Sequence, residues 1–498
     1  MIRLISLVAT AASCFAVFAC ATHTQSASPS GLVISNVTIV SPERVAPLEH
    51  AYLRILNGKI AELSERPLRG ETAIDGTGRY LTPGLIDSHV HLAVAPGFPS
   101  GMTARQAAAH PEIVAAALQQ DPKSYLFFGF TTLVDLFGTA QRTERWNAIE
   151  LRPDAYFCSG AVIIDGQLRL IPTPHFSYDQ PPAERAPTVS ATQNALNMAV
   201  ARMVGDGAIC VKTIYERGLK PTVEETQRLV AAAHAHNLPV FIHANSKDAQ
   251  AFAVATGVDL IVHGMWNGWE LTGNAGLPTD VEGILSDVVK RQVGYQPTIQ
   301  VVVGLRDMIH SGYLSRPDLA DAYPTTLIDW YATEEGGWYA EEIRKYPGFK
   351  GEAGFRESID RVSRATRFLA KANARLLFGS DTPSDSVYTN PPGLNGRLEM
   401  NNWIAAGVSK AKLFRALTVD NARMLRLDKQ IGTVEPGKVA NLLLLHANPL
   451  DSVEAYDTVD MVFLHGRPIP RAELSARKAS AVSANTPAGM SVFQGSVH

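Results

Sequence analysis

The stretch LTPGLIDSHVHL, residues 81–92, is an apolar run that carries two histidines at its polar end. Side chains alternate along a strand, so His89 and His91 would share one face and could reach one metal ion together. Four later segments repeat the pattern of an apolar run ending in a polar side chain: AICVKTIY (208–215), LPVFIHAN (238–245), DLIVHGM (259–265) and RLLFGSD (375–381). Buried strands that are polar only near their C-terminal ends are typical of a parallel barrel with its active site at that face.

The rest of the chain predicts a (β/α)8 TIM barrel with a small β-sandwich. Strand-like runs alternate with helical signals, which is typical of βα units. The expected barrel strands are 84–92, 131–136, 154–163, 208–215, 239–245, 259–265, 293–299 and 375–381. Helices are expected at 221–237, 286–292 and 357–373, the first with a capping-box spacing from Thr222 to Glu225. Runs near both ends, including one with an Asn57–Gly58 turn, are expected to form the sandwich together.

We therefore expect six divisions of the chain. They are a signal peptide or lipoprotein signal (1–20), a flexible tether (21–30), two parts of the sandwich (31–80 and 431–475), the barrel (81–430) and a C-terminal tail (476–498). The stretch 304–356 is too long for an ordinary loop. We interpret it as an insertion with helices of its own, serving either as a lid or substrate wall, or as a packing element or oligomer contact.

The N-terminal residues indicate export. Arg3 precedes an apolar stretch at 4–19 with small residues near its end, which is typical of a signal sequence and too short for a membrane span. The residues 17–20 resemble a lipobox, in which Cys20 would be lipidated and attach the protein to a membrane. Ordinary secretion with cleavage nearby is the alternative. The expected location is the periplasm, the bacterial envelope through a lipid anchor, or the exterior.

Composition limits the partners. The net charge of −3 over 498 residues argues against a nucleic-acid surface, which would need a basic excess. We expect a small-molecule substrate and a homo-oligomer. Two internal cysteines, Cys158 and Cys210, fall in expected strands. We expect Cys210 to be a small buried apolar side chain, although export would also permit a disulfide.

The polar residues at the strand ends predict a metal centre. Imidazoles and a carboxylate, from His243, His263 and Asp381 with the first pair, are ligands for a divalent transition metal. Lys212 is unusual in a buried strand: it is either a snorkelling or salt-bridged lysine, or a neutral amine that reacts with carbon dioxide to form a carbamate. Asp381 could bind a metal and accept a proton from water, or act as a helix N-cap. Zinc is the expected metal, with manganese, cobalt and iron as alternatives.

The chain resembles the amidohydrolase superfamily, specifically its imidazolonepropionase-like and prolidase-like metal-dependent hydrolases. The resemblance runs from about Gly31 to Arg471 and is carried by PGLIDSHVHL (83–92), LLFGSDTP (376–383) and ALTVDNARMLRLDKQIGTVEPGKVANLLLL (416–445). One departure is Asn441, where aspartate is more usual. The resemblance implies two divalent metals: His89, His91 and Asp381 on the first, His243 and His263 on the second, and carbamylated Lys212 as the bridge.

A departure after the fifth strand separates the possible activities. Related deaminases carry a glutamate three residues after the fifth-strand histidine, whereas His243 is followed by Ala244, Asn245 and Ser246. Together with Lys212, this favours a hydrolase that cleaves the amide or peptide bond of a dipeptide or N-acyl amino acid. The alternatives are a mononuclear deaminase or a hydrolase of cyclic amides or lactones. A non-catalytic assembly protein is the third hypothesis, and the complete ligand set argues against it.

Three further residues could contact the substrate. Relatives often have Gly-Gly-His after the third strand, and this chain has His175 after Pro172-Thr173-Pro174. His175 could polarise the substrate carbonyl, or lie in a surface loop. In dipeptidase-like relatives a tyrosine at the position of Tyr215 meets the substrate carboxylate, and Arg217 suits bidentate carboxylate binding. The alternative is that these two residues are an ordinary loop pair.

Overall fold

The computed structural model describes the central part of the chain with short gaps. The described residues are 31–68, 72–92, 95–98, 108–158, 160–164, 167–171, 189–216, 220–271, 273, 276–310, 312–345, 349–384 and 386–478. The predicted signal and tether lie outside them, as does the tail from residue 479 onward. Within these ranges no helix combines the length and the apolar character that a bilayer span requires.

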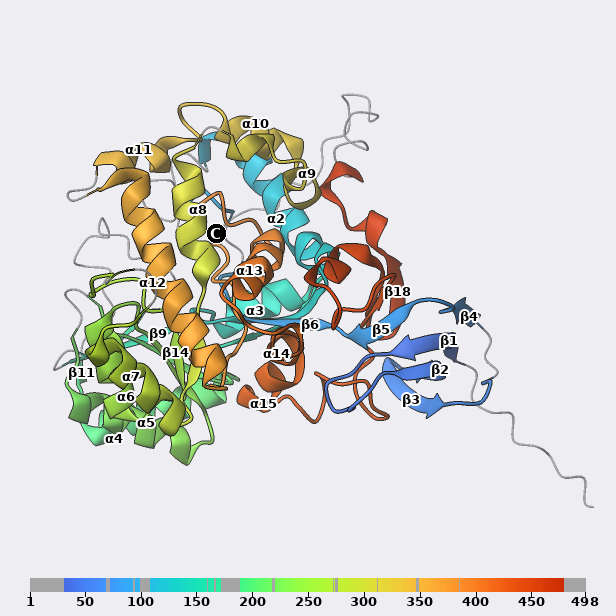
Figure 1. Ribbon diagram of the computed structural model, residues 1–498, viewed down its shortest axis with the longest axis horizontal. Helices are drawn as coiled ribbons and strands as arrows, with labels where there is room; N and C mark the ends of the chain where they lie inside the picture. The colour runs from blue at the N-terminus through green and yellow to red at the C-terminus, as the bar shows by residue number, and fades with distance from the viewer. Residues whose placement is uncertain are drawn as a thin grey trace, which may run out of the picture.

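One sheet joins the two ends of the described chain. Its order is β18-β17-β16-β5-β1-β2-β3, with β4 paired to β1. The strands are β1 (Leu32–Ile39), β2 (Leu48–Leu56), β3 (Lys59–Ser64), β4 (Thr72–Asp75), β5 (Tyr80–Pro83), β16 (Leu442–Leu445), β17 (Val459–Leu464) and β18 (Arg467–Pro470). In Figure 1 the N-terminal strands and β18 lie at the same end of the molecule, and β16 and β17 join them in the sheet. Asn57 and Gly58, both with positive φ, form the expected turn between β2 and β3. Only Gly84 separates β5 from the next strand, β6, which carries His89.

The strands that carry the expected ligands form two further sheets. Their orders are β11-β10-β9-β12-β13-β14-β15 and β6-β7-β8. The strands are β6 (Leu85–Val90), β7 (Phe130–Asp135), β8 (Asp154–Phe157), β9 (Ala161–Ile164), β10 (Gln167–Ile171), β11 (Val189–Ser190), β12 (Val211–Ile214), β13 (Val240–His243), β14 (Leu260–Val262) and β15 (Gly294–Gln296). The pairs from β12 to β15 and from β6 to β8 are all parallel, so their C-terminal ends lie on common edges.

Within the described residues the strands do not join into the single closed barrel that we expected. The third expected strand breaks at Gly160, whose φ is 71°, and β9 then turns into an antiparallel hairpin with β10. The eighth, 375–381, makes an isolated parallel bridge from Leu376 to Tyr295, and Thr382 just after it makes another to Val90. A ladder is prevented there because side chains take the backbone amides: Phe378 donates to Asn421 Oδ1 and Ser380 donates to Asp87 Oδ1.

Helices follow most of these strands. They are α2 (Pro111–Phe127), α3 (Ala140–Asn147), α4 (Gln193–Gly205), α5 (Val223–Ala235), α6 (Lys247–Thr256), α7 (Thr279–Lys290), α8 (Ile299–Met308), α9 (Leu319–Ala322), α10 (Thr325–Tyr331), α11 (Trp338–Lys345), α12 (Gly351–Lys371), α13 (Leu394–Ala405), α14 (Lys410–Arg415) and α15 (Asn421–Met424). The predicted capping box of α5 is present. Helices α7 and α12 begin earlier than the sequence predicted, and α9 to α11 lie in the stretch 304–356. In Figure 1, α4 to α7 lie at the opposite end of the molecule from α9 to α11.

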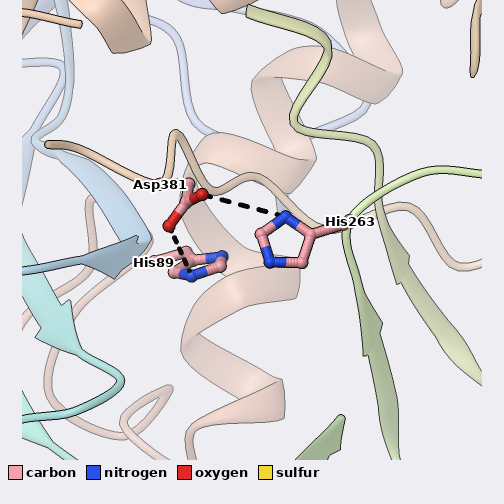
Figure 2. Close-up of side chains that lie close together, drawn as sticks. All are labelled: His89, His263 and Asp381. Atoms are coloured by element: carbon pink, nitrogen blue, oxygen red, sulfur yellow. Dashed lines mark ion pairs between the residues drawn. The ribbon is translucent and has the colours of Figure 1, made fainter. Parts of the chain in front are cut away.

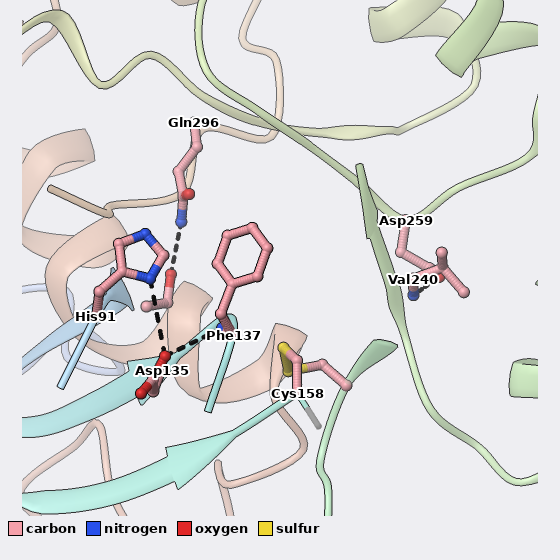
Figure 3. Close-up of a disulfide and its surroundings, with 9 residues drawn as sticks. His91, Asp135, Phe137, Cys158, Val240, Asp259 and Gln296 are labelled. Carbon is pink, nitrogen blue, oxygen red and sulfur yellow. Dashed lines mark hydrogen bonds and ion pairs between the residues drawn. A yellow bond between two sulfur atoms is a disulfide. The ribbon is translucent and has the colours of Figure 1, made fainter. Parts of the chain in front are cut away.

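A disulfide joins Cys158 to Cys210, which corrects our expectation that Cys210 is a free apolar side chain. Cys158 directly follows β8 and Cys210 directly precedes β12, and the Ile209 amide donates to the Phe157 carbonyl between them. The two Cα atoms are 4.5 Å apart, and both side chains are fully buried. Figure 3 shows the disulfide close to Phe137. It ties the strand before the hairpin to the strand that carries Lys212.

Removing this disulfide should lower the stability of the fold. The bridge closes a loop with a sequence separation of 52 residues, for which loop-closure entropy gives about 4 kcal/mol as an upper figure. We expect the double variant Cys158→Ala/Cys210→Ala to lose roughly 2–4 kcal/mol of unfolding free energy in urea. The matched comparison is the wild-type protein under a reducing agent, which should lose a similar amount. An unchanged unfolding midpoint in both samples would contradict a stabilising role.

Candidate metal centre

The expected ligands gather at the C-terminal ends of neighbouring strands. They are His89 in β6, His91 just after it, Lys212 in β12, His243 at the end of β13, His263 just after β14, and Asp381 in the segment 375–382. The ring centroids of His89 and His263 are 5.1 Å apart, and those of His243 and His263 are 4.3 Å apart. The structure therefore brings the set together, while the role of each residue stays a prediction.

Asp381 lies at the centre of this group. Its Oδ1 is 2.9 Å from Nε2 of His89 and also 2.9 Å from Nε2 of His91. Its Oδ2 faces Nδ1 of His263 at 3.8 Å, so the two oxygens point toward different histidines (Figure 2). Burial raises the pKa of the Asp381 carboxyl, but His89 and His263 outweigh burial and hold that pKa well below its usual value. An ionised carboxylate between imidazoles is a ready ligand for a cation.

Lys212 is buried, and no described residue forms a salt bridge or hydrogen bond with its side chain. The side chain is fully inaccessible to solvent, and its Nζ has no hydrogen-bond partner among the described residues. Its Nζ lies 5.7 Å from the centroid of the Phe137 ring. Burial lowers the pKa of the Lys212 ammonium to about 7, against a smaller opposing effect of Asp381. The snorkelling explanation does not fit a side chain with no exposed end.

A second layer of oxygen atoms orients three of the imidazoles. His89 Nδ1 is 3.2 Å from Gln296 Oε1, and His263 Nδ1 is 3.0 Å from Thr298 Oγ1. His91 Nδ1 faces Asp135 Oδ1 at 3.8 Å, as Figure 3 shows. In each ring Nδ1 is therefore directed to an oxygen, which leaves Nε2 for a metal.

This donor set fits a divalent metal. Donor atoms of His89, His263 and Asp381 lie within 4.8 Å of one another. The buried Nε2 of His89 also makes no hydrogen bond with a described residue, although it lies beside Asp381. An imidazole nitrogen and a carboxylate oxygen that face each other in a buried site are both suitable ligand atoms for a metal ion. Burial lowers the pKa of His89 to about 4 and that of His243 to about 3, so both rings are neutral, as metal ligation requires.

Three residues of the site have a left-handed backbone conformation. His263, Thr298 and Asp381 all adopt positive φ, at 78°, 44° and 57°. For residues other than glycine such conformations cost on the order of 1–3 kcal/mol each and tend to cluster at functional sites. Asp87 helps to hold one of them, because its carboxylate accepts from both the amide and the hydroxyl of Ser380, the neighbour of Asp381.

The expected substrate contacts are only partly described. His175 and Arg217 lie outside the described residues. The Tyr215 ring stacks on Phe252 of α6, with centroids 4.4 Å apart, and no contact of this ring with the site histidines is seen. Instead Glu216, which the sequence analysis did not consider, has a carboxylate oxygen 3.4 Å from His243 Nε2.

The sequence analysis also missed the residues whose oxygen atoms face the histidine Nδ1 atoms, namely Asp135, Gln296 and Thr298. Asp135 and Gln296 end β7 and β15, just as His243 ends β13, so the same strand-end pattern would have identified them. Thr298 has no such signal, because its position depends on a left-handed backbone conformation.

Comparison with known proteins supports a particular family. Residues 325–470, which include Asp381 and the strands β16 to β18, match the amidohydrolase family. No curated protein sequence gave a match. The family match covers less than half of the chain, and it supports the resemblance to the amidohydrolase superfamily that the sequence motifs indicated.

Solved structures of prolidases and other amidohydrolases share the fold. A Xaa-Pro dipeptidase with methionine bound in its active site superposes with a TM-score of 0.62 at 19% identity, covering 89% of this chain and 100% of the other. A prolidase in complex with N-methylphosphonate-L-proline gives 0.59 at 21% identity, covering 88% and 99%. A molinate hydrolase gives 0.61 at 16% identity, covering 93% and 99%. These neighbours show a TIM-barrel-like α/β fold.

Proposed function

We propose that this protein is a metal-dependent hydrolase that cleaves the amide or peptide bond of a small substrate, a dipeptide or an N-acyl amino acid. The observation that carries the proposal is the buried group around Asp381, in which the imidazoles of His89 and His91 contact one carboxylate. Near this group lies the buried Lys212, whose Nζ has no hydrogen-bond partner among the described residues. In this proposal His89, His91 and Asp381 hold one divalent metal, and His243 and His263 hold a second. Zinc is the expected metal, and manganese, cobalt and iron are alternatives.

The bridge between the metals is proposed to be a carbamate on Lys212. The neutral amine adds carbon dioxide, which forms a nitrogen–carbon bond and releases one proton. The product is a carboxylate, a ligand that can reach two metals at once. Support comes from the burial of Lys212 and from the missing hydrogen-bond partner of its Nζ among the described residues.

The proposed reaction adds one water to the amide and yields a carboxylic acid and an amine. When bound, the metals would lower the pKa of the attacking water and polarise the carbonyl. Asp381 accepts the proton of this water and passes it to the leaving amine. One of its oxygens lies beside the pair His89 and His91 and the other faces His263, which suits a residue that would bind the first metal and accept a proton from the attacking water. His175 is proposed to assist at the carbonyl oxygen.

A substrate screen tests this proposal. Purified protein loaded with zinc or manganese should hydrolyse dipeptides or N-acyl amino acids and release the free amino acid. Release of ammonia from an aromatic amine, or opening of an uncharged lactam with no activity on dipeptides, would move the assignment to the alternative activities.

The substrate should carry a free carboxylate next to the scissile bond. Arg217 follows the strand that carries Lys212, and a guanidinium binds a carboxylate through two hydrogen bonds. We expect Arg217→Met to lower kcat/KM for acids about 100-fold, which corresponds to one charge-assisted pair, and to change it little for the matching amides. Tyr215→Phe should act in the same direction with a smaller effect. Equal losses on acids and amides would show that neither residue recognises the carboxylate.

Export is part of the proposal. A disulfide such as Cys158–Cys210 forms and persists in oxidising compartments and is rare in the cytosol. This supports a location in the periplasm, on the envelope through a lipidated Cys20, or outside the cell. Labelling with a radioactive fatty acid, compared between the wild-type protein and Cys20→Ala, distinguishes the lipid anchor from ordinary secretion. A homo-oligomer is also proposed.

A further inference from the structure

Helix α8 begins in an unusual way directly behind the metal centre. Its N-cap residue, Thr298, has a left-handed backbone and makes no side-chain hydrogen bond to the helix. A threonine at this position normally accepts a hydrogen bond from the second or third amide of the helix. Here the hydroxyl oxygen is instead 3.0 Å from Nδ1 of His263. The threonine that should cap the helix therefore orients a histidine.

A carboxylate from another helix takes over the capping role. Glu399 of α13 accepts a hydrogen bond from the Ile299 amide at 2.9 Å through Oε1 and one from the Gln300 amide at 2.6 Å through Oε2. The Trp403 indole donates to Oε1 as well, at 2.9 Å. Glu399 and Thr298 are both fully buried. Anions are favoured at a helix N-terminus, where free amides and the helix dipole meet them.

We infer that Glu399 is a positioning residue for the metal centre, acting through Thr298 on His263. By capping α8 in place of Thr298, Glu399 holds the strained start of the helix and leaves the threonine hydroxyl for His263. The hydroxyl accepts from Nδ1–H, which fixes the tautomer of the ring and leaves Nε2 for the metal. The inference rests on the proposed function, since it assigns to Glu399 and Thr298 a role in metal binding.

Metal titration of the apoprotein tests the inference without relying on activity. Zinc binding is measured by competition with a chromophoric chelator for the wild-type protein, Glu399→Gln, Thr298→Val and Thr298→Ser. We expect Glu399→Gln and Thr298→Val each to weaken one of two zinc dissociation constants about 10- to 100-fold, as loss of an outer partner of a ligand does. Thr298→Ser keeps the hydroxyl and should bind zinc like the wild type. The double variant should be no weaker than the more affected single variant, because both changes break the same chain of contacts.

The control is Glu225→Gln. Glu225 is also a buried carboxylate that caps a helix, α5, through the amide of Thr222. The Glu225→Gln variant should unfold at a lower urea concentration than the wild type and should bind zinc with unchanged affinity. If Glu399→Gln behaves in the same way, the role is structural and the inference fails. Should Glu399→Gln not fold, Glu399→Asp replaces it, and unchanged zinc affinity in that variant overturns the inference. Failure of the wild-type protein to bind zinc would overturn the proposed function instead.

Discussion

Replacing Lys212 by alanine should lower kcat about 1000-fold or more. In the proposed site the Lys212 carbamate bridges the metals, and loss of metal-based charge stabilisation is worth several kcal/mol, with tenfold in rate for each 1.4 kcal/mol. The variant should also bind less metal, measured by elemental analysis after gel filtration. Small carboxylates such as propionate should restore part of the activity, because they can occupy the space left by the side chain and supply the missing carboxylate.

Two further variants at this position separate carbamate chemistry from packing. Lys212→Met keeps an apolar chain of similar length against Phe137, and Lys212→Arg keeps a long basic side chain but cannot form this carbamate. Both should be as inactive as Lys212→Ala. Lys212→Met should unfold near the wild-type midpoint, whereas the buried guanidinium of Lys212→Arg should lower the midpoint. A Lys212→Met variant with near wild-type turnover would contradict the proposed bridge.

Replacing Asp381 by asparagine should lower kcat about 100- to 10,000-fold, the usual contribution of a general base. Asparagine has almost the same shape but cannot accept the proton from water, and it removes the negative charge between His89 and His91. KM should change little, because the carboxylate acts on the reacting water rather than on the bound substrate. Steady-state kinetics at saturating metal measures both quantities.

The matched control is Asp259→Asn. Asp259 also binds a histidine, His234, and the Val240 amide, but it lies at the start of β14, whereas His263 follows the end of that strand. This control should affect stability and leave kcat unchanged. An Asp381→Asn variant that keeps more than about a tenth of the wild-type kcat would be incompatible with its role as the proton acceptor.

Much of the site could be predicted because its ligands lie at strand ends. The alternation of side chains in LTPGLIDSHVHL is sufficient to place His89 and His91 on the same face of one strand. The ends of β13 and β14, which are neighbours, bring His243 and His263 together. The capping box of α5 and the Asn57–Gly58 turn were predictable for a similar reason, since both depend on residues a few positions apart.

The features that could not be predicted depend on residues distant in sequence. The 375–382 segment is not a regular strand because Asp87 and Asn421, from two other elements, bind its backbone amides. The Cys158–Cys210 disulfide requires that the end of β8 lie beside the start of β12, although the two cysteines are 52 positions apart in the sequence. Likewise, the contact between Thr298 and His263 requires a left-handed threonine and a cap supplied by Glu399, about 100 positions away.

The number of metal ions bound to each chain tests the central claim most directly. Elemental analysis of the purified protein, with protein concentration from quantitative amino-acid analysis, should give about two divalent metals per chain, because the six proposed ligands are too many for one tetrahedral site. A chelator should remove the metals together with the hydrolytic activity, and zinc or manganese should restore both. One metal or fewer per chain with full amide hydrolysis, or hydrolysis that survives complete metal removal, would contradict the account.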